Sequence, residues 1–204
     1  QVSDTATQTV LVSKENLEGA LYYWASQPAV QGGAFGIFRH DMSRPGQAAE
    51  PFYTTTETPD NRCVACHALS RDGSKMAVTY DGAGGDTAIV TVGSRTAEAA
   101  PHEGDRASYD ATGNFMVTSY AGVLTLRDGN SGAPVAPVPG TSNATHPDVS
   151  PLGDLLVYVE VPSPQIWDYS VFTSGRLVAR TMDAETQTFG EPQVLVPDGL
   201  NFYP

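Results

Sequence analysis

Three stretches of the sequence superimpose without gaps: HALSRDGSKMAVTY at residues 67–80, ASYDATGNFMVTSY at 107–120 and PDVSPLGDLLVYVE at 147–160. Their glycines, Gly73, Gly113 and Gly153, recur every 40 residues. In each copy a short strand leads into a tight turn that ends at the glycine, and a strand rich in β-branched and aromatic residues follows. A hairpin loop of this length needs one residue at positive φ, which glycine adopts without steric cost.

The repeat length predicts a β-propeller. Two further strand-like stretches follow each hairpin, as at residues 87–92 and 123–127, so each repeat holds four short strands. Such a repeat is typical of a propeller blade, whereas helical repeats need amphipathic runs that this sequence lacks. A weaker first copy is found at residues 10–13, 20–24, 35–40 and 51–54. We therefore predict an all-β chain, a β-propeller with about four blades of four-stranded antiparallel sheet, at roughly 8–58, 63–101, 105–140 and 145–199.

The last residues, Asn201 to Pro204, look like the start of another inner strand because Pro204 matches Pro147. That favours part of a larger propeller over a four-bladed ring closed by pairing of the tail with the first blade. No domain boundary is evident. We expect residues 1–204 to form a single propeller domain or a partial propeller.

The hairpin turns resemble those of the TolB-like β-propeller repeat family. The family's Ser-Pro-Asp-Gly turn, followed by Lys or Arg, is similar to the run from Ser70 to Lys75. A second version runs from Ser150 to Asp154, with Leu152 in place of the usual aspartate. The resemblance covers most of the chain and implies the propeller fold. It implies little about function, because one fold carries many functions.

The composition excludes several classes of protein. The 204 residues include 23 acidic and 11 basic side chains, which gives a formal net charge of −12. Nucleic-acid binding is excluded because neutralising phosphates needs clustered Lys and Arg. No apolar run approaches the roughly 20 residues of a transmembrane helix, so we expect no membrane span. The start, Gln1-Val2-Ser3-Asp4, lacks a signal-peptide pattern and reads as a mature N-terminus from which a leader has been removed.

Both cysteines lie in Cys63-Val64-Ala65-Cys66-His67, the C-x-x-C-H sequence of covalent haem attachment. Two thiols at this spacing can form thioethers with both vinyl groups of one haem, and the adjacent histidine then lies under the iron. We predict one haem c per chain, attached through Cys63 and Cys66, with His67 as the proximal ligand. The alternatives are a local disulfide or two structural thiols. Zinc is disfavoured, since no second Cys/His pair has ligand spacing.

The repeat places two further candidates near this motif. His67 falls where a blade's innermost strand begins, and these strands converge around a propeller's central channel. Cys66 aligns with Arg106 and His146. His146 is therefore a candidate second axial ligand, and Arg106 is a candidate partner for a haem propionate. If His146 is instead a turn residue, the sixth iron position is open or taken by one of the methionines, Met42, Met76, Met116 or Met182.

Other notable residues have structural explanations. Met76 and Met116 occupy equivalent places on the second strands of their blades, so we expect them to fill the core. Asp72 and Asp110 belong to hairpin turns and should be solvated. His102 should lie exposed in a loop or at a strand end.

Three functions fit these features. The first is an extracytoplasmic electron-transfer protein, a monohaem c-type cytochrome of the bacterial periplasm or cell surface, because c-type haem is attached outside the cytoplasm. Its acidic surface would steer a basic redox partner or dock against a larger membrane-associated respiratory or photosynthetic complex. The second is a cofactor-free propeller module that binds proteins. The third is a peroxidase-like haem oxidoreductase with an open axial site. No catalytic constellation is recognisable, which favours an electron carrier over an enzyme.

Overall fold

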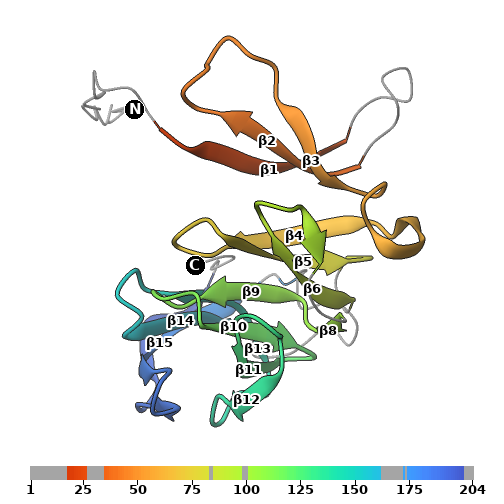
Figure 1. Cartoon of the computed structure of the whole chain (residues 1–204). Coiled ribbons are helices and arrows are strands. Elements are labelled where there is room, and N and C mark those ends of the chain that lie inside the picture. Colours follow the sequence, from red (N-terminus) through yellow and green to blue (C-terminus); the bar gives the residue numbers. More distant parts are fainter. Residues whose placement is uncertain are drawn as a thin grey trace, which may run out of the picture.

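A computed structural model describes residues 18–26, 35–82, 85–97, 101–161, 172 and 174–199 of the chain. Apart from one 3-10 turn at Pro59–Asn61, the regular structure in these ranges consists of strands. Four antiparallel sheets follow one another along the chain (Figure 1). The predicted all-β architecture is therefore confirmed. No helix in the described ranges is long and apolar enough to cross a membrane.

The strands follow the chain order within each sheet. The first sheet contains β1 (Ala20–Ser26), β2 (Phe35–Asp41) and β3 (Glu50–Thr54). The second contains β4 (Val64–Leu69), β5 (Lys75–Tyr80), β6 (Asp86–Thr91), β7 (Thr96–Ala97) and β8 (His102–Glu103). The third contains β9 (Arg106–Tyr109), β10 (Phe115–Tyr120), β11 (Val123–Asp128) and β12 (Pro134–Pro137). The fourth contains β13 (Ala144–Val149), β14 (Leu155–Glu160), β15 (Gly175–Asp183), β16 (Thr188–Phe189) and β17 (Gln193–Gly199).

The outer strand is divided in two sheets. In the second sheet, β7 and β8 pair with opposite ends of β6. In the fourth sheet, β16 and β17 likewise pair with different parts of β15. Each of these two sheets therefore has four strand positions, as the third sheet has. The strand predicted at residues 10–13 and the one predicted to start at residue 201 lie outside the described residues.

The three repeated hairpins have the same turn. The N–H of Gly73, Gly113 and Gly153 donates to the carbonyl oxygen three residues earlier, at 2.9, 3.3 and 2.9 Å. Their φ angles are +72°, +73° and +77°, a region that favours glycine. The prediction of a positive-φ glycine at each turn is confirmed.

A side-chain oxygen closes each of these turns. Ser70, Asp110 and Ser150 each accept a hydrogen bond from the backbone N–H five residues later, at 2.9, 3.1 and 3.1 Å. Asp110 also accepts from the Thr112 hydroxyl at 2.7 Å and is only 6% exposed. The expectation that Asp110 is solvated is therefore wrong, because its carboxylate serves the turn from inside.

The hydrophobic core lies between the faces of consecutive sheets, as in a propeller. One cluster joins the first two sheets and includes Ile37, Tyr53 and Met76. A second joins the second and third sheets, and includes Met116. A larger cluster joins the third and fourth sheets. Met76 and Met116 are fully buried, which confirms that they fill the core.

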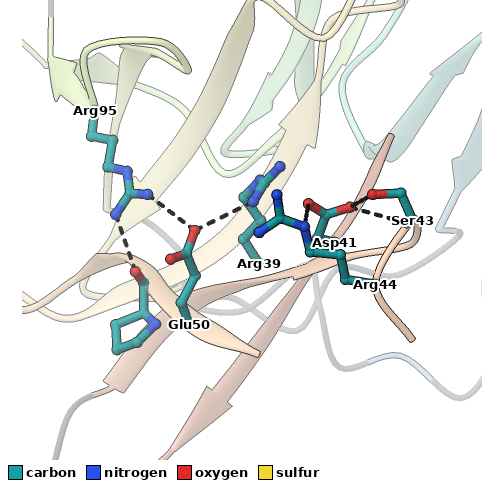
Figure 2. Close-up of polar contacts among 7 residues, drawn as sticks. Arg39, Asp41, Ser43, Arg44, Glu50 and Arg95 are labelled. Carbon is teal, nitrogen blue, oxygen red and sulfur yellow. Dashed lines mark hydrogen bonds and ion pairs between the residues drawn. The ribbon is translucent and has the colours of Figure 1, made fainter. Parts of the chain in front are cut away.

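An ion pair connects the rims of the first two sheets, and its carboxylate is shared with a second arginine of the first sheet (Figure 2). Arg95, at the turn after β6, contacts Glu50 of β3 at 3.1 Å, and Arg39 of β2 contacts the same carboxylate at 3.3 Å. Figure 2 also shows Asp41 between Ser43 and Arg44. Because these groups are exposed, each pair contributes only about 0–1 kcal/mol. The hydrophobic cluster beneath them therefore holds the two sheets together.

His102 is not the exposed residue that the sequence suggests. It lies on β8 opposite Thr87, and its Nε2 is buried without a partner among the described residues. The imidazole packs so closely on Gly132 that a Cβ there would overlap it. Burial, assisted by the positive charge of Arg127, lowers the pKa of His102 to about 4. The ring is thus a neutral packing group.

Candidate functional site

The Cys-x-x-Cys-His motif begins at Cys63, directly before β4, and continues on β4, an edge strand that contacts β9 of the next sheet. Val64 pairs with Tyr80 and His67 with Val78, so three steps on β4 match two on β5. This is a β-bulge with one extra residue. On a regular strand, residues three apart face opposite sides. The extra residue instead brings Val64 and His67 to the side of the first sheet, where Val64 joins the core cluster.

The extra residue also places the side chains of Cys63 and Cys66 on the same face of the strand. Neither cysteine is in a disulfide; Cys63 is exposed and Cys66 is half-buried. They open with His67 into one cavity of about 530 Å³, whose wall is mostly apolar. The remaining wall residues are Trp24, Val64, Ala65 and Arg106. The bulge therefore places both thiols on the face opposite Val64 and His67, while Cys63, Cys66 and His67 all border this cavity.

The indole of Trp24 ties the first sheet to the motif. Its Nε1 donates to the Val64 carbonyl oxygen at 2.7 Å. Near it, Nε2 of His67 lies 3.4 Å from the carbonyl oxygen of Tyr22. Burial lowers the pKa of His67, and the contact with the Tyr22 carbonyl opposes that effect. The imidazole is consequently neutral near pH 7. Because a carbonyl oxygen only accepts, Nε2 carries the proton in this contact, and metal binding through Nε2 requires the contact to break.

Backbone and ionic contacts hold the first cysteine. The Cys63 N–H donates to the Asp81 carboxylate at 3.2 Å, and the Asp81 N–H donates to the Cys63 carbonyl oxygen at 2.9 Å. Arg62 pairs with Asp81 at 2.8 Å and with Asp86 at 3.0 Å, and its guanidinium lies over the Tyr80 ring. The main chain at Cys63 is thus fixed while its thiol stays accessible.

A second cavity, which we call the channel cavity, lies between β4, β9 and β13. Its volume is about 350 Å³. The three repeats meet here, since its wall includes Cys66 and His67 of β4, Arg106 of β9 and His146 of β13. Cys63 is not part of this wall, and His146 is not part of the other cavity. Arg106, Cys66 and His67 border both cavities.

His146 occupies the same kind of position as Cys66. Thr145 pairs with Val159 and Asp148 with Val157, so β13 also has a bulge with one extra residue. His146 lies within it at a φ of +50°. The bulges explain how two aligned positions on edge strands direct functional side chains away from the regular strand pattern.

Arg106 and His146 contact each other directly. Arg106 Nε donates to His146 Nε2 at 3.4 Å, while Thr145 Oγ1 lies 3.1 Å from His146 Nδ1. Arg106 Nη1 also donates to the Asp105 carbonyl oxygen at 3.1 Å and pairs with the Asp105 carboxylate at 3.5 Å. In this arrangement the Nε2 lone pair of His146 points at Arg106.

Within the described ranges, no three His, Cys, Asp or Glu side chains gather as metal ligands. A haem iron needs fewer protein ligands, because the porphyrin supplies four nitrogens and the protein only the axial groups.

The sequence reasoning missed Arg71. This residue lies in the first repeated hairpin, lines the channel cavity and donates from Nη2 to the Val149 carbonyl oxygen at 2.6 Å. A signal was present, since the equivalent positions of the other two copies are Ala111 and Pro151. Of the three repeated turns, only the first has a positively charged residue at this position, so Arg71 departs from the repeat.

No protein-family model matches the chain, and no curated protein matches it. Solved structures do. A nidogen/laminin complex covers 87% of this chain at 10% identity and a TM-score of 0.57, and 62% of that chain is matched. TolB from Acinetobacter baumannii also covers 87%, at 17% identity and a TM-score of 0.57, with 41% of TolB matched. Kuenenia stuttgartiensis hydrazine synthase covers 89%, at 12% identity and a TM-score of 0.50, with 53% matched.

At these identities the similarity concerns the fold, which is the TolB-like β-propeller that the repeat predicts. The chain spans about two fifths to three fifths of the length of these structures. One neighbour is part of a protein complex and another is an enzyme. Because the fold alone does not select a function, the function must be argued from the site.

Proposed function

We propose that the chain is an extracytoplasmic electron-transfer protein, a monohaem c-type cytochrome built on a TolB-like propeller. The observation that carries the proposal is the shared cavity of the motif. Cys63, Cys66 and His67 open into one mostly apolar space, and neither cysteine is in a disulfide. The bulge in β4 makes this possible for a motif on a strand.

Each residue of the site has a defined part. Cys63 and Cys66 would hold the haem through thioethers, and the neutral imidazole of His67 would be the proximal ligand. Trp24 would cover the apolar porphyrin edge, and Arg106 would pair with a propionate. The bound haem supplies the one-electron Fe(II)/Fe(III) couple. The two cysteines outside any disulfide, the apolar wall and the cation beside it fit this group.

His146 is the better candidate for the sixth ligand. It lines the channel cavity with His67, whereas Met76, Met116 and Met182 are buried between sheets. Its Nε2 now accepts from Arg106, so iron ligation requires that contact to break. While it persists, the sixth position stays open. This contact supports the second candidate, a haem oxidoreductase with an open axial site.

The same proposal implies a cellular location and a class of redox partner for the chain. Haem attachment to such a motif takes place outside the bacterial cytoplasm, and the TolB-like fold is consistent with a periplasmic protein. The net charge of −12 would steer a basic redox protein, or the chain would dock as a subunit of a larger membrane-associated redox complex.

The test is an absorption spectrum of the chain produced in a host competent for cytochrome c maturation. We expect a c-type α-band after dithionite reduction and a pyridine haemochrome that resists acid–acetone extraction. Cys63→Ala with Cys66→Ala should abolish covalent haem, and His40→Ala on β2 is the matched control that should not. Absence of a Soret band would end the proposal and leave a cofactor-free propeller module.

The same sample separates the two haem functions. Carbon monoxide should not bind the reduced protein if His146 is the sixth ligand, and His146→Ala should then make it bind. Binding of carbon monoxide to the unchanged protein would favour the open-site oxidoreductase.

A further inference from the structure

Two arginines lie at the wall of the channel cavity, although the net charge of the chain is strongly negative. Two guanidiniums, of Arg71 and Arg106, border it in a chain whose net charge is −12. The carboxylate on its wall is that of Asp148, which accepts from the Ser108 hydroxyl at 3.2 Å. The other titratable side chains on the wall are Cys66, His67, Tyr109 and His146. The wall thus has two cations and one carboxylate, and Arg106 also pairs with the Asp105 carboxylate, outside the wall, at 3.5 Å.

Arg71 has donors to spare. A guanidinium has five N–H donors, and Arg71 uses one of them on the Val149 carbonyl oxygen. Within the described ranges it forms no ion pair, whereas Arg39, Arg62 and Arg95 each pair with a carboxylate. The side chain thus bridges from the second sheet to β13 at the cavity wall, without an ion-pair partner among the described residues.

A buried phenol adds a second observation. Tyr109 lines the same cavity and is 2% exposed, and its hydroxyl oxygen is buried without a hydrogen-bond partner in the described part of the chain. Leaving a buried hydroxyl unpaired costs about 1–3 kcal/mol. An acceptor oxygen brought by a ligand would remove that cost, while the two arginines would hold its charge.

We propose that the channel cavity is a carboxylate-binding site, with Arg71 and Arg106 as its cations and Tyr109 as a neutral donor. Its volume of about 350 Å³ equals the share of roughly 12 water molecules in the liquid, which suffices for a small organic acid. The carboxylate can come from a free acid or from a propionate of a haem held at Cys66. The site itself stands whether or not haem is attached.

The experiment is isothermal titration calorimetry with succinate, and with the uncharged succinamide as its matched control. We expect succinate, and not succinamide, to bind the haem-free chain. Arg71→Gln and Arg106→Gln should each weaken binding about tenfold, and Tyr109→Phe several-fold, because charge-assisted bonds exceed neutral ones. Arg44→Gln, at an arginine on the far rim that is mostly exposed, should bind as the unchanged chain does. Circular dichroism confirms that each variant is folded.

The haem-loaded chain, whose Soret band reports attachment independently, then distinguishes the sources. Loss of succinate binding on loading identifies the propionate as the occupant, and unchanged binding identifies a free acid. The proposal is overturned if the haem-free chain gives no heat with succinate, if succinamide binds equally, or if the Arg71→Gln and Arg106→Gln variants bind as the unchanged chain does. A chain that never acquires haem would refute the cytochrome proposal and leave this one to be decided by the haem-free titration.

Discussion

A buried hydrogen bond between the hydroxyls of Tyr53 and Tyr80 joins the first sheet to the sheet that contains the motif. Tyr53 belongs to β3 and Tyr80 to β5, where it lies opposite Val64 of the motif. The two hydroxyl oxygens are 2.7 Å apart, and both side chains are almost completely buried in the cluster between the first two sheets. Burial raises the pKa of both phenols, so the pair stays neutral and hydrogen-bonded.

Changing Tyr80→Phe removes one hydroxyl and leaves the other without its partner. We expect the free energy of unfolding to fall by about 1–3 kcal/mol, which is the cost of a buried unsatisfied polar group. For a chain of this size each kcal/mol lowers Tm by about 2–4 °C. Tyr53→Phe should have a similar effect. The double variant should lose less than the sum of the two, because replacing both partners by apolar groups of the same shape is nearly neutral.

The assay is urea unfolding of the unchanged chain, both single variants and the double variant, followed by tryptophan fluorescence. The four free energies form a double-mutant cycle that isolates the coupling between the hydroxyls. A coupling within about 0.5 kcal/mol of zero would mean that the two oxygens do not interact, and the described packing of β3 on the motif sheet would be wrong.

Three further predictions concern the hairpins and the buried histidine. His102 has a pKa of about 4 in the folded chain against roughly 6.5 in the unfolded chain, so the free energy of unfolding should fall by about 3 kcal/mol as the pH drops from 6.5 to 4. His102→Gln should lessen this loss, as measured by urea unfolding at pH 7 and pH 4. Gly132→Ala should lower Tm, since Gly132 has a φ of +74° and the new Cβ would overlap the His102 ring. Adding His102→Ala should restore part of the lost Tm, and an unchanged Tm in Gly132→Ala would contradict the packing of His102 on Gly132. Asp110→Ala should cost about 1 kcal/mol in thermal unfolding, whereas Asp110→Ser should cost less because serine closes the equivalent turns; equal losses would show that the carboxylate has another role.

The hairpins were predictable because their causes are local. A turn that needs a positive φ selects glycine, and Gly73, Gly113 and Gly153 mark the same step of the repeat. The strands beside these turns, and the burial of Met76 and Met116, follow from the same alignment. Much of the fold was therefore present in a pattern within each repeat.

The site was less predictable because its causes lie between repeats. The bulge in β4 is defined by its pairing with β5 and has no sequence signal of its own. Arg71 reaches the carbonyl of Val149, two sheets further along the chain. His102 is buried by Gly132 of the following sheet, so a residue that reads as a loop histidine becomes part of the packing. Such contacts appear only once the sheets are placed side by side.

The extra residue in β4 also bears on how a repeat protein could gain a cofactor. On β9, Arg106 to Tyr109 pair with β10 without interruption, so the same five-residue motif grafted there would send its two thiols to opposite faces of the sheet. On β13 the extra residue lies one repeat position later, between Thr145 and Asp148, so a graft aligned on His146 would place its thiols at residues 143 and 146, on opposite faces. Blades that look interchangeable in sequence thus differ in their capacity to anchor a prosthetic group, because the position of the extra residue in the innermost strand decides which face each thiol takes.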